Sequence, residues 1–177
     1  PSTRTHSSFE VAAKRLSADV TNFDVAHSSI TKGESVRETV ETLQAMRTDY
    51  IIVRHGRSGL PGMIARQTKA SVISAGDGAH AHPTQGLLDM LTIRHHKPRF
   101  ENLSVAIVGD IRHSRVARSA WLALSTLGVT DIRIVAPAAL MPDADQFSGC
   151  QRVESIEAGI AGVDVVMMLR IQKERMQ

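Results

Sequence analysis

Residues 104–135, SVAIVGDIRHSRVARSAWLALSTLGVTDIRIV, contain the pattern from which the fold class follows. Short apolar runs predict strands at Ser104–Val108 and at 132–135, and the segment between them, 114–127, predicts a helix. Gly128 stands in the C-cap position, where a glycine commonly ends a helix. A strand, a helix and a second strand in this order are typical of a parallel sheet with a right-handed crossover.

The same alternation of strands and helices continues on both sides of this segment. Further strands are predicted at 19–23, 50–54, 71–74 and 163–169, and further helices after the opening STRT, at 35–46, 60–67 and 83–95, and from Ser155. In the helix at 35–46, the SVRE beginning has the spacing of a capping box. Together these elements predict an α/β protein with two lobes, each a parallel sheet flanked by helices.

The polar stretch HHKPRFENLS suggests a domain junction near residues 96–102. We therefore expect one domain at 1–97, with helix 83–96 as its linker, and a second at 98–177. Both lobes are expected to be incomplete, because the first begins at a helix that should follow a strand and the second has only three predicted strands. Clefts between lobes are favoured ligand sites.

The composition favours an ordinary globular protein and disfavours several functional classes. Of the 177 residues, 42% are hydrophobic and 22% are charged, and the net charge is +3. One cysteine excludes an internal disulfide and fits a reducing cytoplasm, so we expect a cytoplasmic protein. No apolar run is long enough to span a membrane. With one Trp, one Tyr and no Lys/Arg block, we expect no nucleic-acid partner.

Cationic, hydroxyl and amide side chains follow the predicted strands, where open α/β sheets bind their ligands. These candidates are Ser28 and Lys32 in AHSSITKGES, Arg54 in VRH, His82 and Gln85 in GDGAHAHPTQ, Arg115 in GDIRHSR, and Arg170 and Gln172 in RIQKER. At the first helix, STRT places Ser2, Thr3, Arg4 and Thr5 where N–H groups and a partial positive charge suit an anion. Their convergence predicts a site for small anions.

Each of these residues, taken alone, also has a simpler interpretation. STRT fits an ordinary N-cap, Lys32 a solvated loop charge, and Arg54 an ion pair at a strand end. No metal-ligand spacing and no nucleophile motif of the G-x-S-x-G type is present, so we expect neither a metal site nor a cofactor.

Six motifs in this order and spacing resemble aspartate carbamoyltransferase catalytic chains. They are STRT, SSITKGES, VRH, GDGAHAHPTQ, VGDIRHSR and RIQKER, and the resemblance covers essentially the whole chain. STRT with HPTQ is shared by the wider family, which includes ornithine carbamoyltransferase, whereas KGES and RIQKER favour the aspartate enzyme. Two features differ: His6 replaces a usual Arg, and the HPLPR segment that closes over carbamoyl phosphate is absent. Whether this segment is active by itself is therefore an open question.

The resemblance implies transfer of the carbamoyl group of carbamoyl phosphate to L-aspartate, in pyrimidine biosynthesis, by a homotrimer. It assigns carbamoyl phosphate to the domain at 1–97 and aspartate to the domain at 98–177. The implied phosphate ligands are Ser2, Thr3, Arg4 and Thr5, and Thr5, Arg54 and His82 are the implied donors to the carbonyl oxygen. His82 is expected to act as a neutral donor, because nearby cations lower its pKa.

Gln85 is implied to bind the carbamoyl NH2 group through its amide oxygen. The resemblance further assigns Ser28 and Lys32 to a loop from the neighbouring subunit, and Lys32, Arg115, Arg170 and Gln172 to aspartate. Regulatory or dihydroorotase-like chains are further candidate partners. Two alternatives stay open: an ornithine or other carbamoyltransferase, and a non-catalytic carbamoyltransferase-like scaffold.

Overall fold

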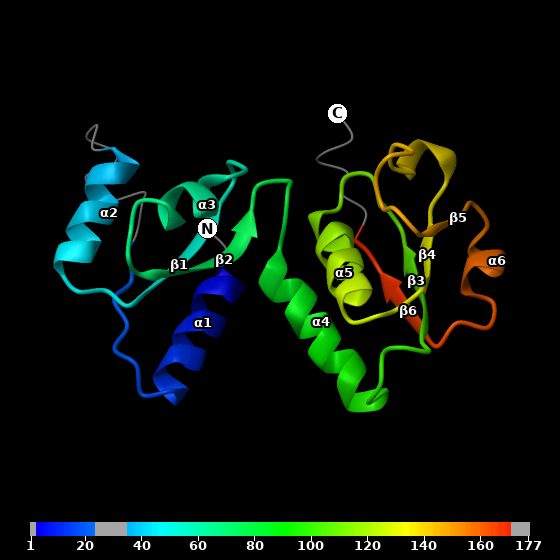
Figure 1. The fold of residues 1–177 in the computed structure, drawn as a ribbon, viewed down its shortest axis with the longest axis horizontal. Helices are drawn as coiled ribbons and strands as arrows, with labels where there is room; N and C mark the ends of the chain where they lie inside the picture. Colours follow the sequence, from blue (N-terminus) through cyan, green and yellow to red (C-terminus); the bar gives the residue numbers. More distant parts are fainter. Residues whose placement is uncertain (1–2, 24–34, 171–177) are drawn as a thin grey trace. The chain divides into compact units, whose positions relative to one another are not determined.

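The computed structural model describes residues 3–23 and 35–170, which form two units, Pro1–Ala75 and Gly76–Gln177 (Figure 1). The described elements of the first unit are α1 (Thr3–Arg15), α2 (Val36–Ala45), β1 (Tyr50–His55) and α3 (Leu60–Ala65), with β2 (Ser71–Asp77) continuing into the second. Strands β1 and β2 pair in a two-stranded sheet.

A small apolar cluster holds the first unit together. Val40 of α2 and Leu60 and Ile64 of α3 are buried, and Ile51 and Val53 of β1 pack against them. Helix α2 begins at the predicted capping box: Ser35 Oγ accepts from Glu38 N at 3.2 Å, and the Glu38 carboxylate accepts from Ser35 N at 2.7 Å. The backbone N–H groups of Ser35 and Glu38, at the beginning of the helix, are therefore both satisfied locally.

The second unit is built on a four-stranded parallel sheet with the order β5-β4-β3-β6. Its elements are α4 (Pro83–His96), β3 (Ser104–Val108), α5 (Arg115–Thr126), β4 (Asp131–Val135), the 3-10 turn η3 (Ala138–Leu140), β5 (Gln151–Val153), α6 (Ile156–Ile160) and β6 (Val165–Met168). The β3–α5–β4 segment is the strand–helix–strand unit that the sequence predicts.

Strand β3 lies inside this sheet and is buried on both faces. Val105 and Ile107 belong to the main core with α4 and α5, whereas Ala106 and Val108 face a second cluster that contains Val135. Helix α6 contacts β3, β4 and β5, and Figure 1 shows it on the side of the sheet opposite α5. A strand covered on both faces reads as a continuous apolar run, which explains the sequence SVAIV.

The predicted fold class, α/β with parallel sheets flanked by helices, is confirmed, but three expectations differ from the structure. The strand at 19–23 is wrong: these residues pair with no strand, and Asn22 instead donates to Glu10 of α1 at 3.3 Å. Strand β2 extends to Asp77, because its last three residues are buried. Strand β5 was not predicted, since QRV has little apolar character.

The boundary between the two units also lies earlier than the expected domain junction. The units divide after Ala75, whereas the sequence favoured a junction near 96–102. The reason is that α4, expected as a linker, packs along α5 and shares its core. The assignment of one ligand to each domain stays a prediction. Among the described residues, no helix combines the length and apolar character that crossing a membrane requires.

Gly159 of α6 lies so close to β4 that a methyl group there has no room. A Cβ at this position would lie 2.5 Å from Val135 Cγ2 and 2.8 Å from Cγ1. Overpacking of this kind costs about 1–3 kcal/mol, which outweighs the roughly 1 kcal/mol that Ala gains over Gly in a helix. We therefore predict that Gly159→Ala lowers the free energy of unfolding of the full-length protein in urea titrations.

Gly56→Ala is the matched control, because a Cβ at Gly56 meets no atom within 4 Å. Its unfolding midpoint should stay near that of the wild type. A Gly159→Ala protein as stable as the wild type would show that α6 does not press on β4 as described.

Candidate functional site

In the first unit, Arg54 near the end of β1 contacts the first turn of α1. Its Nη1 donates to Thr5 Oγ1 at 2.7 Å and to the Ala75 carbonyl of β2 at 3.5 Å. The alternating burial of β1 directs Ile51 and Val53 into the core and leaves Arg54 exposed. Two predicted site residues, 49 positions apart in sequence, are therefore brought into contact.

This contact places a guanidinium beside the beginning of a helix. The first N–H groups of a helix have no intrahelical acceptor, and the helix dipole adds a partial positive charge there. Thr3 and Arg4 are exposed in the same turn as Thr5. A planar guanidinium and several N–H donors in one place are suited to a phosphate or carboxylate group.

In the second unit, His82 ends a closed loop that follows β2. Asp77 N donates to Ala81 O at 2.8 Å, and Gly76 and Gly78 adopt φ angles of 140° and 48° that favour glycine. His82 is the N-cap residue of α4, and its backbone N–H donates to Ser119 Oγ at 2.9 Å. The half-buried imidazole of His82 is thus attached to a main chain that is held in place.

Gln85, one helical turn further on, has its amide oriented by a carboxylate that the sequence analysis did not select. Gln85 Nε2 donates to Asp89 Oδ1 at 2.9 Å. Burial raises the pKa of Asp89, and the hydrogen bond from Gln85 opposes this rise. With its NH2 group directed at Asp89, Gln85 presents its amide oxygen to the other side. The i,i+4 spacing of a Gln and an Asp on a helix is the signal that could have identified Asp89.

The two arginines expected to bind aspartate occupy different surroundings. Arg115 is the first residue of α5, where the buried Ser114 caps the helix by accepting from Ala117 N at 3.1 Å. Arg115 Nη1 donates to Gly78 O at 2.8 Å, and a Cβ on Gly76 would lie 3.3 Å from both terminal nitrogens. Arg115 is therefore tied to the loop that leads to His82. Arg170 follows β6 and is exposed.

The remaining predicted site residues, Ser2, Ser28, Lys32 and Gln172, lie outside the described residues. Within the part of the chain that is described, no three His, Cys, Asp or Glu side chains form a group that could hold a metal ion. His113 Nδ1 lies 2.8 Å from the buried Asp110 Oδ1.

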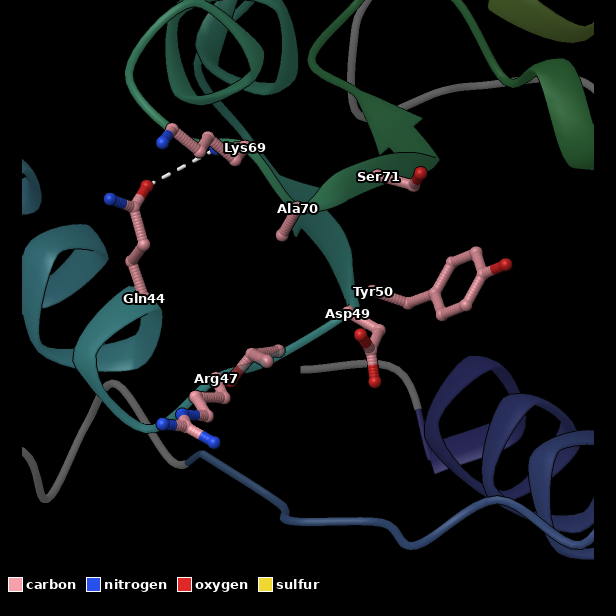
Figure 2. A pocket seen from close by; sticks show the side chains of 8 residues that line it. Gln44, Arg47, Asp49, Tyr50, Lys69, Ala70 and Ser71 are labelled. Atoms are coloured by element: carbon pink, nitrogen blue, oxygen red, sulfur yellow. Dashed lines mark hydrogen bonds between the residues drawn. The ribbon is translucent and has the colours of Figure 1, made fainter.

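A pocket of about 640 Å³ opens in the first unit, but it contains none of the predicted site residues (Figure 2). Its lining includes Tyr50 and Ser71, the first residues of β1 and β2, and Gln44 Oε1, which accepts from Lys69 N at 3.1 Å. The pocket is therefore at the amino ends of the strands, whereas Arg54 is near a carboxyl end. Ligands of open α/β sheets bind at carboxyl ends, so we place the candidate site at Arg54 and not at this pocket.

Comparison with known proteins identifies relatives along the whole chain. The model of the aspartate/ornithine carbamoyltransferase carbamoyl-P binding domain matches residues 1–95. An aspartate transcarbamoylase from Trypanosoma cruzi, crystallised with aspartate and phosphate, is 31% identical with a TM-score of 0.87. The match covers 99% of this chain and 61% of that one.

The catalytic subunit of M. jannaschii aspartate transcarbamoylase is 35% identical, with a TM-score of 0.87, over 99% of this chain and 60% of that one. The Trypanosoma cruzi enzyme has also been crystallised with N-(phosphonacetyl)-L-aspartic acid, and there the identity is 32%, the TM-score 0.86 and the coverage 99% and 60%. The chain thus spans about 60% of the length of the solved structures that it matches. The match of more than half of the sequence to the family model, together with the fold, shows that the chain belongs to the aspartate/ornithine carbamoyltransferase family.

Proposed function

We propose that the full-length protein transfers the carbamoyl group of carbamoyl phosphate to L-aspartate, which yields N-carbamoyl-L-aspartate and phosphate. The observation that carries the proposal is the likeness of nearly the whole chain to aspartate transcarbamoylases crystallised with these ligands. The Arg54–Thr5 contact supports it, because it supplies cationic and hydroxyl donors at a helix N-terminus. As part of the same proposal, the protein acts in pyrimidine biosynthesis, and its location is proposed to be the cytoplasm.

The reaction needs positioning and charge stabilisation more than a nucleophile from the protein. The amine of aspartate attacks the carbonyl carbon, negative charge develops on the carbonyl oxygen, and phosphate leaves when the tetrahedral intermediate collapses. We assign Arg54 and Thr5 as donors to that oxygen, with Thr5 also part of the phosphate site formed by residues 2–5. Hydrogen-bond donors aimed at a developing oxyanion are commonly the largest single contribution to stabilisation of the transition state.

His82 is assigned as a further donor to the carbonyl oxygen, and Gln85 as the acceptor for the carbamoyl NH2 group. The hydrogen bond from Gln85 to Asp89 supports the second assignment, since it leaves the amide oxygen to accept. An amide oxygen suits a neutral NH2 group, whereas a carboxylate would favour a cation. Asp89 thus acts through Gln85 as a positioning residue.

The acceptor amine is proposed to be aspartate because its two carboxylates match cationic and amide groups. Arg170 with Gln172 is assigned to one carboxylate and Arg115 to the other, since guanidinium groups bind carboxylates in a bidentate way. Ser28 and Lys32 are assigned to a loop that closes over the substrates of a neighbouring subunit in a homotrimer. An acceptor such as ornithine carries a side-chain cation and would require an acidic partner instead.

The proposal is tested by measuring carbamoyl transfer by the full-length protein with aspartate and with ornithine as acceptors. We expect kcat/KM for aspartate to exceed that for ornithine by at least about 10-fold to 10²-fold, since ornithine lacks the second carboxylate and loss of one charged pairing costs roughly 1.5–3 kcal/mol. Preferential turnover of ornithine would assign the protein to the other branch of the family. No transfer to either amine would support a non-catalytic scaffold.

A second prediction concerns the role of Arg54. Arg54→Ala should lower kcat by about 10²–10³, which is the usual cost of one oxyanion donor. Carbamoyl phosphate affinity, measured by equilibrium titration, should change much less, because the helix N-terminus retains its own donors.

Arg66→Ala is the control, since Arg66 is an exposed arginine at the C-cap of α3. It should keep near wild-type turnover. A fall in kcat of less than about tenfold for Arg54→Ala would remove Arg54 from the oxyanion site.

A further inference from the structure

The loop between β2 and α4 closes on itself, and two of its carbonyl groups accept hydrogen bonds from another element. Asp77 pairs with Ala81, and His80 N donates to Asp77 O at 2.8 Å, so the base of the loop is satisfied internally. The carbonyl groups of Gly78 and Ala79 instead accept from side chains outside the loop. Gly78 is buried, so its carbonyl group needs a donor, which here comes from another element.

Helix α5 supplies these donors from its first two turns. Arg115 Nη1 donates to Gly78 O at 2.8 Å, and Arg118 Nη1 donates to Ala79 O at 2.9 Å. Arg118 Nη2 also donates to Arg112 O at 3.2 Å, so its planar fork joins the loop before α4 to the loop before α5. Residues three apart lie on one face of a helix, which brings both guanidinium groups to the same loop.

The third contact from α5 reaches His82 itself. Ser119 is 8% exposed, and its Oγ accepts the backbone N–H of His82 at 2.9 Å. Helices α4 and α5 are closely packed at this point, since a Cβ on Gly86 of α4 would lie only 3.0 Å from Ser119 O. This close packing brings the Ser119 hydroxyl within hydrogen-bond distance of His82 N. On its other side, the His82 carbonyl accepts from Gln85 N at 3.0 Å and from Gly86 N at 3.1 Å.

We propose that Ser119, assisted by Arg118, is a positioning residue for His82, so that α5 sets the direction in which the imidazole is presented to the substrate. The inference rests on the proposed function, because it gives His82 a donor role in carbamoyl transfer. Ser119 touches no reacting atom in this scheme. It holds the peptide group from which the imidazole projects, and displacement of a catalytic group by about 1 Å can cost on the order of 10²-fold in rate.

A double-mutant cycle in the full-length protein tests this role. Ser119→Ala should lower kcat by about tenfold to a hundredfold, with KM for aspartate changed by less than about threefold, and Arg118→Met should lower kcat in the same direction. In a His82→Ala background, adding Ser119→Ala should reduce kcat by less than about twofold, because coupled residues are not additive. Ser125→Ala is the control, since Ser125 is an exposed serine on the same helix and should leave kcat unchanged.

If Ser119→Ala lowers kcat equally with and without His82, the serine does not act through His82 and the proposal is overturned. Amide hydrogen exchange at His82 gives a readout that needs no turnover. We expect slow exchange in the wild type and exchange at least about tenfold faster in Ser119→Ala. Equal exchange rates at His82 in the wild type and in Ser119→Ala would show that Ser119 does not hold the His82 backbone, even if carbamoyl transfer is found. A wild type that transfers no carbamoyl group but shows the exchange difference would overturn the proposed function and the catalytic role of the anchor, while leaving the contact itself established.

Discussion

Strand β3 is the element of the second unit on which the positions of the others depend. It is buried on both faces, so each of its backbone polar groups must be paired within the sheet. Strands β4 and β6 satisfy this need by pairing with it in parallel register from Ser104 and Val105 onward. Asp164 strengthens the beginning of β3 by accepting from Ser104 N at 3.1 Å and from Lys97 Nζ at 3.0 Å, which lowers its pKa to about 2. Because the strands are parallel, their carboxyl ends lie at one edge, and α5 begins just beyond that edge.

The two polar clusters described here are arranged by the same physical means. In each, a residue proposed to bind substrate is held by a hydrogen-bond partner that leaves its other donors or acceptors available. Thr5 accepts one N–H of Arg54, Asp89 accepts from the NH2 group of Gln85, and Ser119 accepts from the backbone of His82. Such preorganisation is what a reaction without a protein nucleophile requires, since its rate depends on orientation and on donors placed before charge develops.

Much of the fold could be predicted from the sequence, because the strongest elements carry local signals. The apolar run of β3, the N-cap Ser114 and the capping box at Ser35 are each recognisable without tertiary information. The segment at 19–23 has the propensity of a strand, yet within residues 3–23 and 35–170 no strand pairs with it. Likewise, α4 resembles a linker in sequence, and only its packing on α5 places it in the second unit.

The residue types of the candidate site could be predicted from the sequence, but the contacts that position them could not. Arg118 and Ser119 look like ordinary helix residues until the loop at 76–82 is folded against them.

In the proposed reaction, Arg54 polarises the carbonyl group of bound carbamoyl phosphate. Isotope-edited infrared spectroscopy of ¹³C-labelled carbamoyl phosphate, bound to the full-length protein without aspartate, measures this polarisation directly. The account predicts that the carbonyl stretch moves to lower frequency on binding to the wild type, because hydrogen bonds weaken the C=O bond. In Arg54→Ala, at equal ligand occupancy, most of that shift should be lost. The same frequency in both proteins at full occupancy would contradict the account.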